Sequence, residues 1–201
     1  MLPPPLQVRV YFDFASTLSY VAHHAMERLG ADLVVLEIAL DWRPIDLTRI
    51  TGWPRGAVVT GPRRDKVERV AAALGVPVSM PARWLDSRPA SAIALALAGT
   101  PQEPAWREQV WRAAFEAGCD IGDAAEIRRL AAAIGVDASA GTSPEALARV
   151  DAETRTAYEA QVNGVPTFML GRWPLSGIQE DDTMRAHFAR WARKERGMAV
   201  Q

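Results

Sequence analysis

The sequence predicts an α/β fold in which a β-α-β unit and a β-β-α unit flank a large block of helices. Three observations support this prediction. An alternating strand pattern near the start runs into a helix and a second strand. Residues 63–159 then show only helical periodicity, and two short strand patterns with a last helix follow them. The order of the elements therefore indicates one α/β domain with an all-helical domain inserted in its middle.

The first unit begins with residues 7–14, whose apolar side chains alternate as in a strand entering a core. Helical spacing follows from Leu18 to Leu29, and Gly30 is expected to end that helix. Residues 33–40 are mostly apolar and β-branched, which predicts a second strand buried on both faces. Strand, helix and strand at this spacing predict a parallel pair of strands.

The middle of the chain is predicted to be helical throughout, after a loop that reaches residue 62. Several segments carry N-terminal signals for helices. These signals are Ser87 before Pro89, Thr100 with Glu103, Asp123, and Thr142 with Glu145. Gly135 is expected to close the helix that Asp123 opens.

The second unit starts with strands predicted at 167–170 and 173–176, joined by a tight turn. A final helix is predicted over 181–196. This layout is the thioredoxin fold with a helical insertion. The predicted domains are a thioredoxin-like domain, residues 1–62 and 160–201, and an insertion domain, residues 63–159.

Composition limits the partners and the chemistry. Of 201 residues 49% are hydrophobic, and 23 basic residues balance 24 acidic ones, so neither nucleic acid nor a membrane is expected as a partner. Residues 1–5 resemble a short extended arm rather than a secretion signal, which makes the cytoplasm the expected location. The single cysteine, Cys119, cannot form an internal disulfide. No metal site is predicted, because no metal-ligand pattern involves His23, His24 or His187, which we interpret as helix surface or interface residues.

Two stretches far apart in the sequence are expected to form the active site. Residues 164–168 read Gly-Val-Pro-Thr-Phe, and a proline that opens a strand lacks an N–H and permits a cis peptide bond. About 150 residues earlier, the stretch 11–20 runs from a strand into a helix whose first turn carries two serines. We expect the two stretches to face each other.

Short motifs in a characteristic order link the chain to a known superfamily. They are Asp13-Phe14-Ala15-Ser16, Ser19-Tyr20, Trp42-Arg43-Pro44, Leu74-Gly75-Val76-Pro77, Gly118 to Asp123, and Gly164 to Phe168. In these motifs the chain resembles the thioredoxin-like superfamily that contains the bacterial DsbA oxidoreductases. Within it, the chain is similar to the branch of 2-hydroxychromene-2-carboxylate isomerase and kappa-class glutathione transferase.

Redox members of this superfamily carry a Cys-x-x-Cys where this chain has Ser16-Thr17-Leu18-Ser19. Disulfide exchange requires a thiolate, so this motif cannot perform it. Cys119 lies in the helical insertion and is interpreted as a small core or surface residue.

The resemblance to the isomerase branch implies that Ser16 is the catalytic residue. Its hydroxyl would donate a hydrogen bond to the thiolate of bound glutathione, and the helix N-terminus behind it would lower the thiol pKa further. Taken alone, Ser16 is better explained as an ordinary helix N-cap, and only the family resemblance favours the catalytic role.

The resemblance also implies a cofactor site for glutathione. Val165 and Pro166 would pair with the cysteinyl part of glutathione like an added strand, and Ser176 and Gln179 would lie at its γ-glutamyl end. Gln179 stands where the isomerases usually have an acidic residue, and Ser-Gly-x-Gln resembles the FrnE-like oxidoreductases. Thr17 replaces a proline that is common in the isomerases.

Five further residues are candidates for binding the substrate. Ser19 and Tyr20 follow Ser16 on the same helix, and Tyr20 is alternatively a packing residue. Arg43 can bind a substrate carboxylate or pair with a nearby aspartate. Asp86 and Arg88 precede a helix where the isomerases place a ligand-binding pair, although a helix cap explains them equally well. Trp42 and Trp84 are candidate walls of an aromatic site.

Three functions follow, in this order. The first is a glutathione-dependent isomerase or transferase, in which the glutathione thiolate adds to a small electrophilic or aromatic substrate. The second is a non-redox DsbA-like binding protein that has lost its Cys-x-x-Cys. The third is a disulfide oxidoreductase. The resemblance also makes a homodimer, formed through the helical insertion, an expectation.

Overall fold

The computed structural model describes residues 4–197, and its centre is a four-stranded mixed sheet in the order β2-β1-β3-β4. The strands are β1 (Leu6–Phe12), β2 (Ile38–Pro44), β3 (Thr167–Leu170) and β4 (Trp173–Ser176). β1 pairs in parallel with β2 and antiparallel with β3, which pairs antiparallel with β4. The predicted thioredoxin fold and the predicted strands at 167–170 and 173–176 are confirmed. Part of the N-terminal arm expected at residues 1–5 lies outside the described residues.

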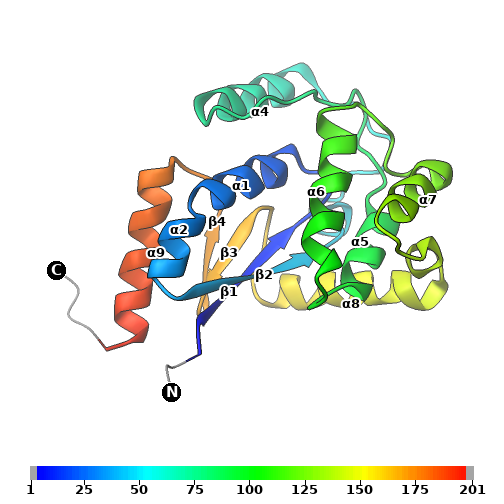
Figure 1. Ribbon diagram of the computed structural model, residues 1–201. Coiled ribbons are helices and arrows are strands. Elements are labelled where there is room, and N and C mark those ends of the chain that lie inside the picture. Colours follow the sequence, from blue (N-terminus) through cyan, green and yellow to red (C-terminus); the bar gives the residue numbers. More distant parts are fainter. Residues whose placement is uncertain (1–3, 198–201) are drawn as a thin grey trace.

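Helices cover the sheet and form the insertion (Figure 1). They are α1 (Thr17–Arg28), α2 (Gly30–Val35), α3 (Leu47–Thr51), α4 (Gly61–Ala73), α5 (Arg88–Ala96), α6 (Gln102–Phe115), α7 (Ala124–Ala133), α8 (Pro144–Glu159) and α9 (Asp181–Glu195). A 3-10 turn, Ala138–Gly141, precedes α8. In the described residues, no helix is long and apolar enough to cross a membrane.

Alternation along β1 decides which helices cover which face of the sheet. Val8 and Val10 pack in one cluster with residues of α1 and α9, while Tyr11 packs with Ala157 of α8. Successive side chains of a strand point to opposite faces, so α1 and α9 lie on one face and α8 on the other.

The second strand was predicted over residues 33–40, but β2 begins five residues later, at Ile38. Residues 30–35 form α2 instead, and β2 starts at Ile38, after Glu37 adopts a left-handed φ of 49°. Val34 and Val35 are 76% and 82% exposed, so this β-branched run is not a buried strand. β2 is also an edge strand, and five of its seven residues are half-buried rather than covered on both faces.

The helix starts agree with the sequence only in part. Asp123 caps α7, and Gly135 follows that helix with a φ of 68°, as predicted. Neither expected capping box forms. The Thr100 hydroxyl donates to the Leu97 carbonyl at 2.7 Å, and the cap of α8 is Ser143 rather than Thr142. A side chain one residue closer to the helix reaches its free amides more directly.

An aromatic cluster joins the sheet to the insertion. Trp111 of α6 lies 5.1 Å from Phe12 and 5.4 Å from Phe14, measured between ring centroids. His23 of α1 is 5.1 Å from the same ring and only 6% exposed, so of the two expected placements, helix surface or interface, it occupies the interface between α1 and α6. The predicted domain boundaries stay a prediction, and one hydrophobic cluster includes residues from both predicted domains.

Candidate active site

The turn between β1 and α1 positions Ser16. The Ser16 amide donates to the Asp13 carbonyl at 2.9 Å, and its backbone is extended, with φ −90° and ψ 110°. From this position the Ser16 hydroxyl caps α1 by accepting the Ser19 amide at 3.3 Å. The cap occupies a lone pair and leaves the hydroxyl hydrogen free to donate.

The start of α1 provides further donors beside this hydroxyl. The amides of Thr17 and Leu18 make no hydrogen bond within the described residues, as is usual for the first turn of a helix. Together with the helix dipole, they favour an anion at this position.

A small pocket lies over Ser16. Its floor includes residues 15–18, and Val165 from the segment before β3 contributes one wall. The two stretches that the sequence singles out therefore do face each other. The pocket volume is about 40 Å³, which is room for a few water molecules.

Residues of α4 and of the segments around it roof the pocket. They are Val59, Arg63, Val67, Met80, Pro81 and Trp84. The Thr17 hydroxyl donates to the Met80 sulfur at 3.2 Å. Figure 1 shows α4 above α1. This roof largely closes the pocket in the structure.

The peptide bond between Val165 and Pro166 is cis. Neither the N–H nor the C=O of Val165 has a backbone partner in the described part of the chain, so both groups remain available to a ligand. Ser176 and Gln179 are exposed and lie outside the pocket lining, with the Ser176 hydroxyl 3.3 Å from the Thr167 hydroxyl.

The predicted substrate residues of α1 are buried rather than open to the pocket. The Ser19 hydroxyl accepts the Asp13 amide at 3.5 Å, and its residue is 0% exposed. Tyr20 donates to Glu116 at 3.0 Å, and burial raises the pKa of its phenol. The structure therefore supports the packing interpretation of Tyr20.

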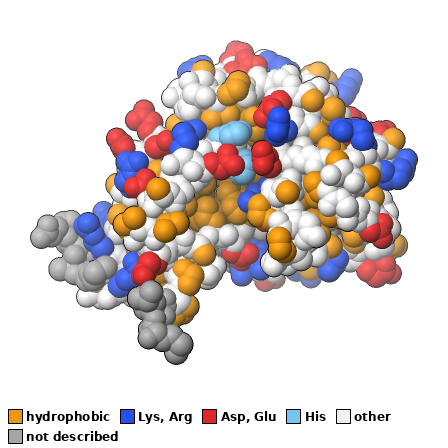
Figure 2. All heavy atoms as spheres, in the orientation of Figure 1, with side chains coloured by type: hydrophobic (Ala, Val, Ile, Leu, Met, Phe, Trp, Pro, Cys, Tyr) orange, Lys and Arg blue, Asp and Glu red, His pale blue; other side chains and the backbone are white. Residues whose placement is uncertain are grey.

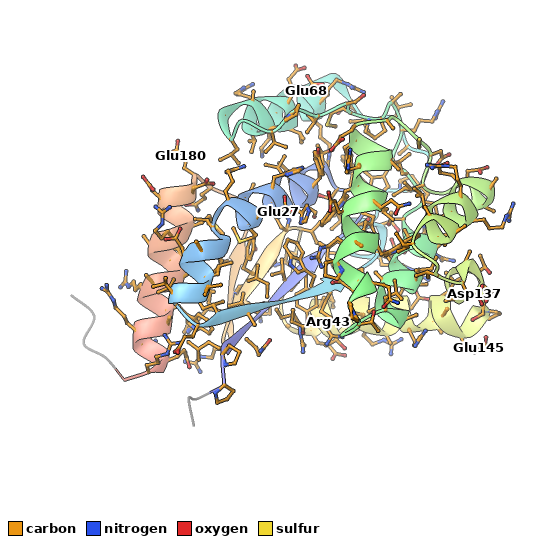
Figure 3. The ribbon with its side chains drawn as sticks, in the orientation of Figure 1. Glu27, Arg43, Glu68, Asp137, Glu145 and Glu180 are labelled. Carbon is orange, nitrogen blue, oxygen red and sulfur yellow. The ribbon has the colours of Figure 1, made fainter. Side chains whose placement is uncertain are left out.

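The remaining candidates for substrate binding also lie outside the pocket. Arg43 pairs with Asp41 at 2.9 Å, and Figure 3 shows it well away from α4, whose position Glu68 marks. Asp86 pairs with Arg55 at 3.0 Å and accepts the Arg88 amide at 3.2 Å. The second contact satisfies the first amide of α5.

Sequence reasoning missed Arg63, the cation of this pocket. Its guanidinium carbon lies 3.7 Å from the ring centre of Trp53 and 5.3 Å from that of Trp84. It has no carboxylate partner in residues 4–197, whereas the neighbouring Arg64 pairs with Glu68. Burial lowers the pKa of Arg63. One feature of the sequence could have identified it. Arg63 lies in the first turn of α4, which has no acidic residue. The helix dipole disfavours a cation at that position, so an arginine there calls for a functional explanation.

Asp13 was also missed, although it lies in a quoted motif. It is 0% exposed, and burial raises the pKa of its carboxyl to about 6. One oxygen accepts the Ala15 amide and the other the Leu47 amide, both at 2.8 Å.

Other features are less suited to chemistry at Ser16. A hollow of about 550 Å³ lies between α6 and α7, and its lining shares no residue with the Ser16 pocket.

Cys119 is half-buried after α6 and does not line the Ser16 pocket. No group of three or more potential metal ligands occurs in the described residues. Figure 2 shows histidine side chains beside acidic ones on this face. Glu27 of α1 lies 3.3 Å from His23 and 3.2 Å from His24.

Comparison with known proteins identifies the family to which this fold belongs. The family model for the DSBA-like thioredoxin domain matches residues 7–189. The chain belongs to the DSBA-like thioredoxin family. No curated protein matches the chain.

Several solved structures share this family fold. A 2-hydroxychromene-2-carboxylate isomerase has 23% identity and a TM-score of 0.77, covering 97% of this chain and 100% of its own. A probable DsbA oxidoreductase from Streptomyces coelicolor has 20% identity and a TM-score of 0.76, covering 98% and 92%. The cytosolic disulfide reductase DsbM from Pseudomonas aeruginosa, solved with GSH, has 18% identity and a TM-score of 0.63, covering 96% and 98%. These likenesses establish the fold.

Proposed function

We propose that the protein is a glutathione-dependent isomerase or transferase of the 2-hydroxychromene-2-carboxylate isomerase type. The observation that carries the proposal is the Ser16 hydroxyl at the start of α1, facing Val165 across a pocket that contains no cysteine. Disulfide chemistry at this position would need a thiolate that the chain does not supply there. A family relative solved with GSH supports glutathione as the source of the thiol.

The donors of the pocket suit a bound thiolate. The Ser16 hydroxyl hydrogen and the free amides of Thr17 and Leu18 would stabilise negative charge on sulfur and so lower the pKa of the thiol. Bound glutathione would supply a nucleophilic thiolate that adds to an electrophilic carbon of the substrate.

Two other residues would position the cofactor. Val165 offers a free N–H and C=O for strand-like pairing with the cysteinyl part of glutathione. Arg63, stacked on Trp53 and without a carboxylate partner in the described residues, would bind a carboxylate of glutathione or of the substrate. Ser176 and Gln179, being outside the pocket lining, would contact only a ligand that extends beyond it.

The pocket volume adds a requirement to the proposal. About 40 Å³ can hold the thiolate but not the rest of glutathione, since small-molecule sites typically measure roughly 300–1,000 Å³. Glutathione binding would therefore require α4 and the segment around Met80 to move away from α1.

The test is calorimetric titration with glutathione, combined with far-ultraviolet absorbance of the thiolate. Ser16→Ala should raise the thiol pKa of bound glutathione by about one to two units, and so lower its thiolate fraction, as expected for loss of a hydrogen bond to a charged group worth about 1.5–3 kcal/mol. Ser143→Ala is the matched control, because Ser143 also caps a helix but lies on α8, outside the pocket.

Two results would contradict the proposal. The first is an absence of wild-type binding at millimolar glutathione. The second is an equal thiolate fraction in Ser16→Ala and Ser143→Ala, which would mean that Ser16 only caps its helix.

The second candidate is a non-redox binding protein, and the small, roofed pocket is the observation that favours it. This function predicts no glutathione binding and no effect of Ser16→Ala on ligand binding. A disulfide oxidoreductase ranks third, and an insulin-reduction assay is expected to be blank because Cys119 lies outside the pocket.

A further inference from the structure

Asp13 connects three segments of the chain beneath Ser16. Its carboxylate accepts the Ala15 amide, next to Ser16, and the Leu47 amide at the start of α3. Ser87, at the start of α5, lies near the same carboxylate and lowers its pKa. The Asp13 carbonyl accepts the Ser16 amide at 2.9 Å. The side-chain carboxylate and the backbone carbonyl of Asp13 therefore both hold the turn that positions the Ser16 hydroxyl.

The charged groups around Asp13 belong to a separate ion-pair network. Asp46, which is 1% exposed and caps α3, faces Asp13 with like charge and pairs with Arg55. Arg55 also pairs with Asp86 at 3.0 Å, before α5, and Arg49 of α3 lies 3.9 Å from Asp46. No cation pairs with Asp13 in the described residues. Its negative charge is held by two backbone amides, whereas Asp46 and Asp86 of the network both pair with Arg55.

We propose that Asp13 is a positioning residue whose ionised carboxylate fixes the turn carrying Ser16, and whose protonation loosens that turn. A carboxylate can accept both amides at once, one on each oxygen. Once protonated, the oxygen that carries the hydrogen is a much weaker acceptor, so the hydrogen bond from the Ala15 amide or from the Leu47 amide is weakened. Weakening either contact loosens a segment of the Ser16 site, because Leu47 packs with Ala15 and Trp84 of the pocket lining.

Amide NMR of the wild-type protein tests the first part without any ligand. The Ala15 and Leu47 amide shifts should titrate together with a shared midpoint near pH 6, where burial places the Asp13 pKa, and the Ser16 amide should follow. In Asp13→Asn this shared transition should disappear, while Asp46→Asn, which keeps a helix cap, should retain it. Separate midpoints, or no transition at Ala15 and Leu47, would overturn the proposal.

Ligand binding tests the consequence for the site, and this part rests on the proposed function. S-methylglutathione is the probe, because it has no thiol proton to titrate. Its affinity should fall at least threefold between pH 7.5 and 5 in the wild type and in Asp46→Asn, and should be independent of pH in Asp13→Asn. An affinity of Asp13→Asn for S-methylglutathione that still depends on pH would contradict the positioning role. If the wild type binds no probe at any pH, the proposed function fails, and the NMR titration still decides the role of Asp13.

Discussion

The hydroxyl of Ser16 has two lone pairs and one hydrogen, and the helix cap occupies a single lone pair. Capping a helix and donating to a ligand are therefore compatible roles for this residue. The same position would favour a thiolate if it carried a cysteine, because a helix N-terminus lowers a thiol pKa.

Replacing Ser16 by cysteine should create a reactive thiol. In the background Cys119→Ser, we expect the Ser16→Cys protein to form a mixed disulfide with oxidised glutathione, releasing one reduced glutathione. The bond should persist, because Ser19 cannot act as a resolving thiol. Intact mass spectrometry measures the adduct. Modification slower than that of Cys119 in the wild type would contradict the proposed electrostatics of the pocket.

His23 makes folding stability depend on pH. Burial lowers the pKa of its imidazole to about 3, below the unfolded value of 6.5, so the unfolded chain gains the proton first as pH falls. Its Nε2 atom lies 3.3 Å from Glu27 but makes no hydrogen bond. The stability that neutral His23 provides is complete above pH 6.5 and is lost progressively below it.

Replacing His23 should remove this part of the acid sensitivity. Between pH 6.5 and 4.5 the wild type should lose about 2–3 kcal/mol relative to His23→Gln, at 1.36 kcal/mol per pH unit. Urea unfolding of both proteins measures this difference. The opposite effect of Asp13, whose raised pKa favours folding as pH falls toward 4, is common to both proteins and cancels. A difference that stays constant with pH would be incompatible with a neutral, buried His23.

At the scale of elements, α4 is the part of the site that is held most weakly. Val67 and Ala71 are its buried residues, and Arg64 ties it to the Met80 and Pro81 carbonyls at 3.1 and 3.2 Å. An element with little buried apolar surface opens locally at a low free energy.

Removing Arg64 should loosen this roof without unfolding the protein. We expect Arg64→Ala to increase hydrogen exchange in α4 by about thirtyfold, since its two lost hydrogen bonds contribute about 1 kcal/mol each. Global stability should change little. Arg185→Ala, on the surface of α9, is the control. Unchanged exchange in α4 would mean that apolar contacts, rather than Arg64, hold the roof in place.

At the scale of the whole molecule, Trp111 joins the sheet to the insertion. Its ring contacts Phe12, Phe14, Trp42 and His23, and it is 0% exposed. The sheet and the inserted helices therefore share one core, which favours a single unfolding transition.

Truncating Trp111 should destabilise both parts together. Trp111→Ala is expected to lower the free energy of unfolding by about 3–5 kcal/mol. Trp173→Ala, at a residue that is 58% exposed, should change it by less than about 1 kcal/mol. Urea unfolding followed by circular dichroism measures both. Two separate transitions in Trp111→Ala would show that the parts fold independently.

Local patterns in the sequence predicted much of the fold. Both strands of the second unit follow from their apolar patterns and from the turn between them, and Asp123 and Gly135 mark the ends of α7 by their own backbone chemistry. Residues 33–40 were misassigned because β-branched residues favour a strand only where packing covers them, and Val34 and Val35 are not covered.

The sequence alone determined the order of the elements, the serine at the start of α1 and the lack of a second cysteine. These properties are local, since they depend on periodicity, capping and residue type. The tertiary structure decided what surrounds Ser16: the roof from α4, the Arg63 side chain stacked on Trp53, and the buried Asp13. It also places Arg43 and Tyr20 outside the lining of the Ser16 pocket. Such contacts join residues up to about 150 positions apart, and their burial and charge exist only once the chain has folded.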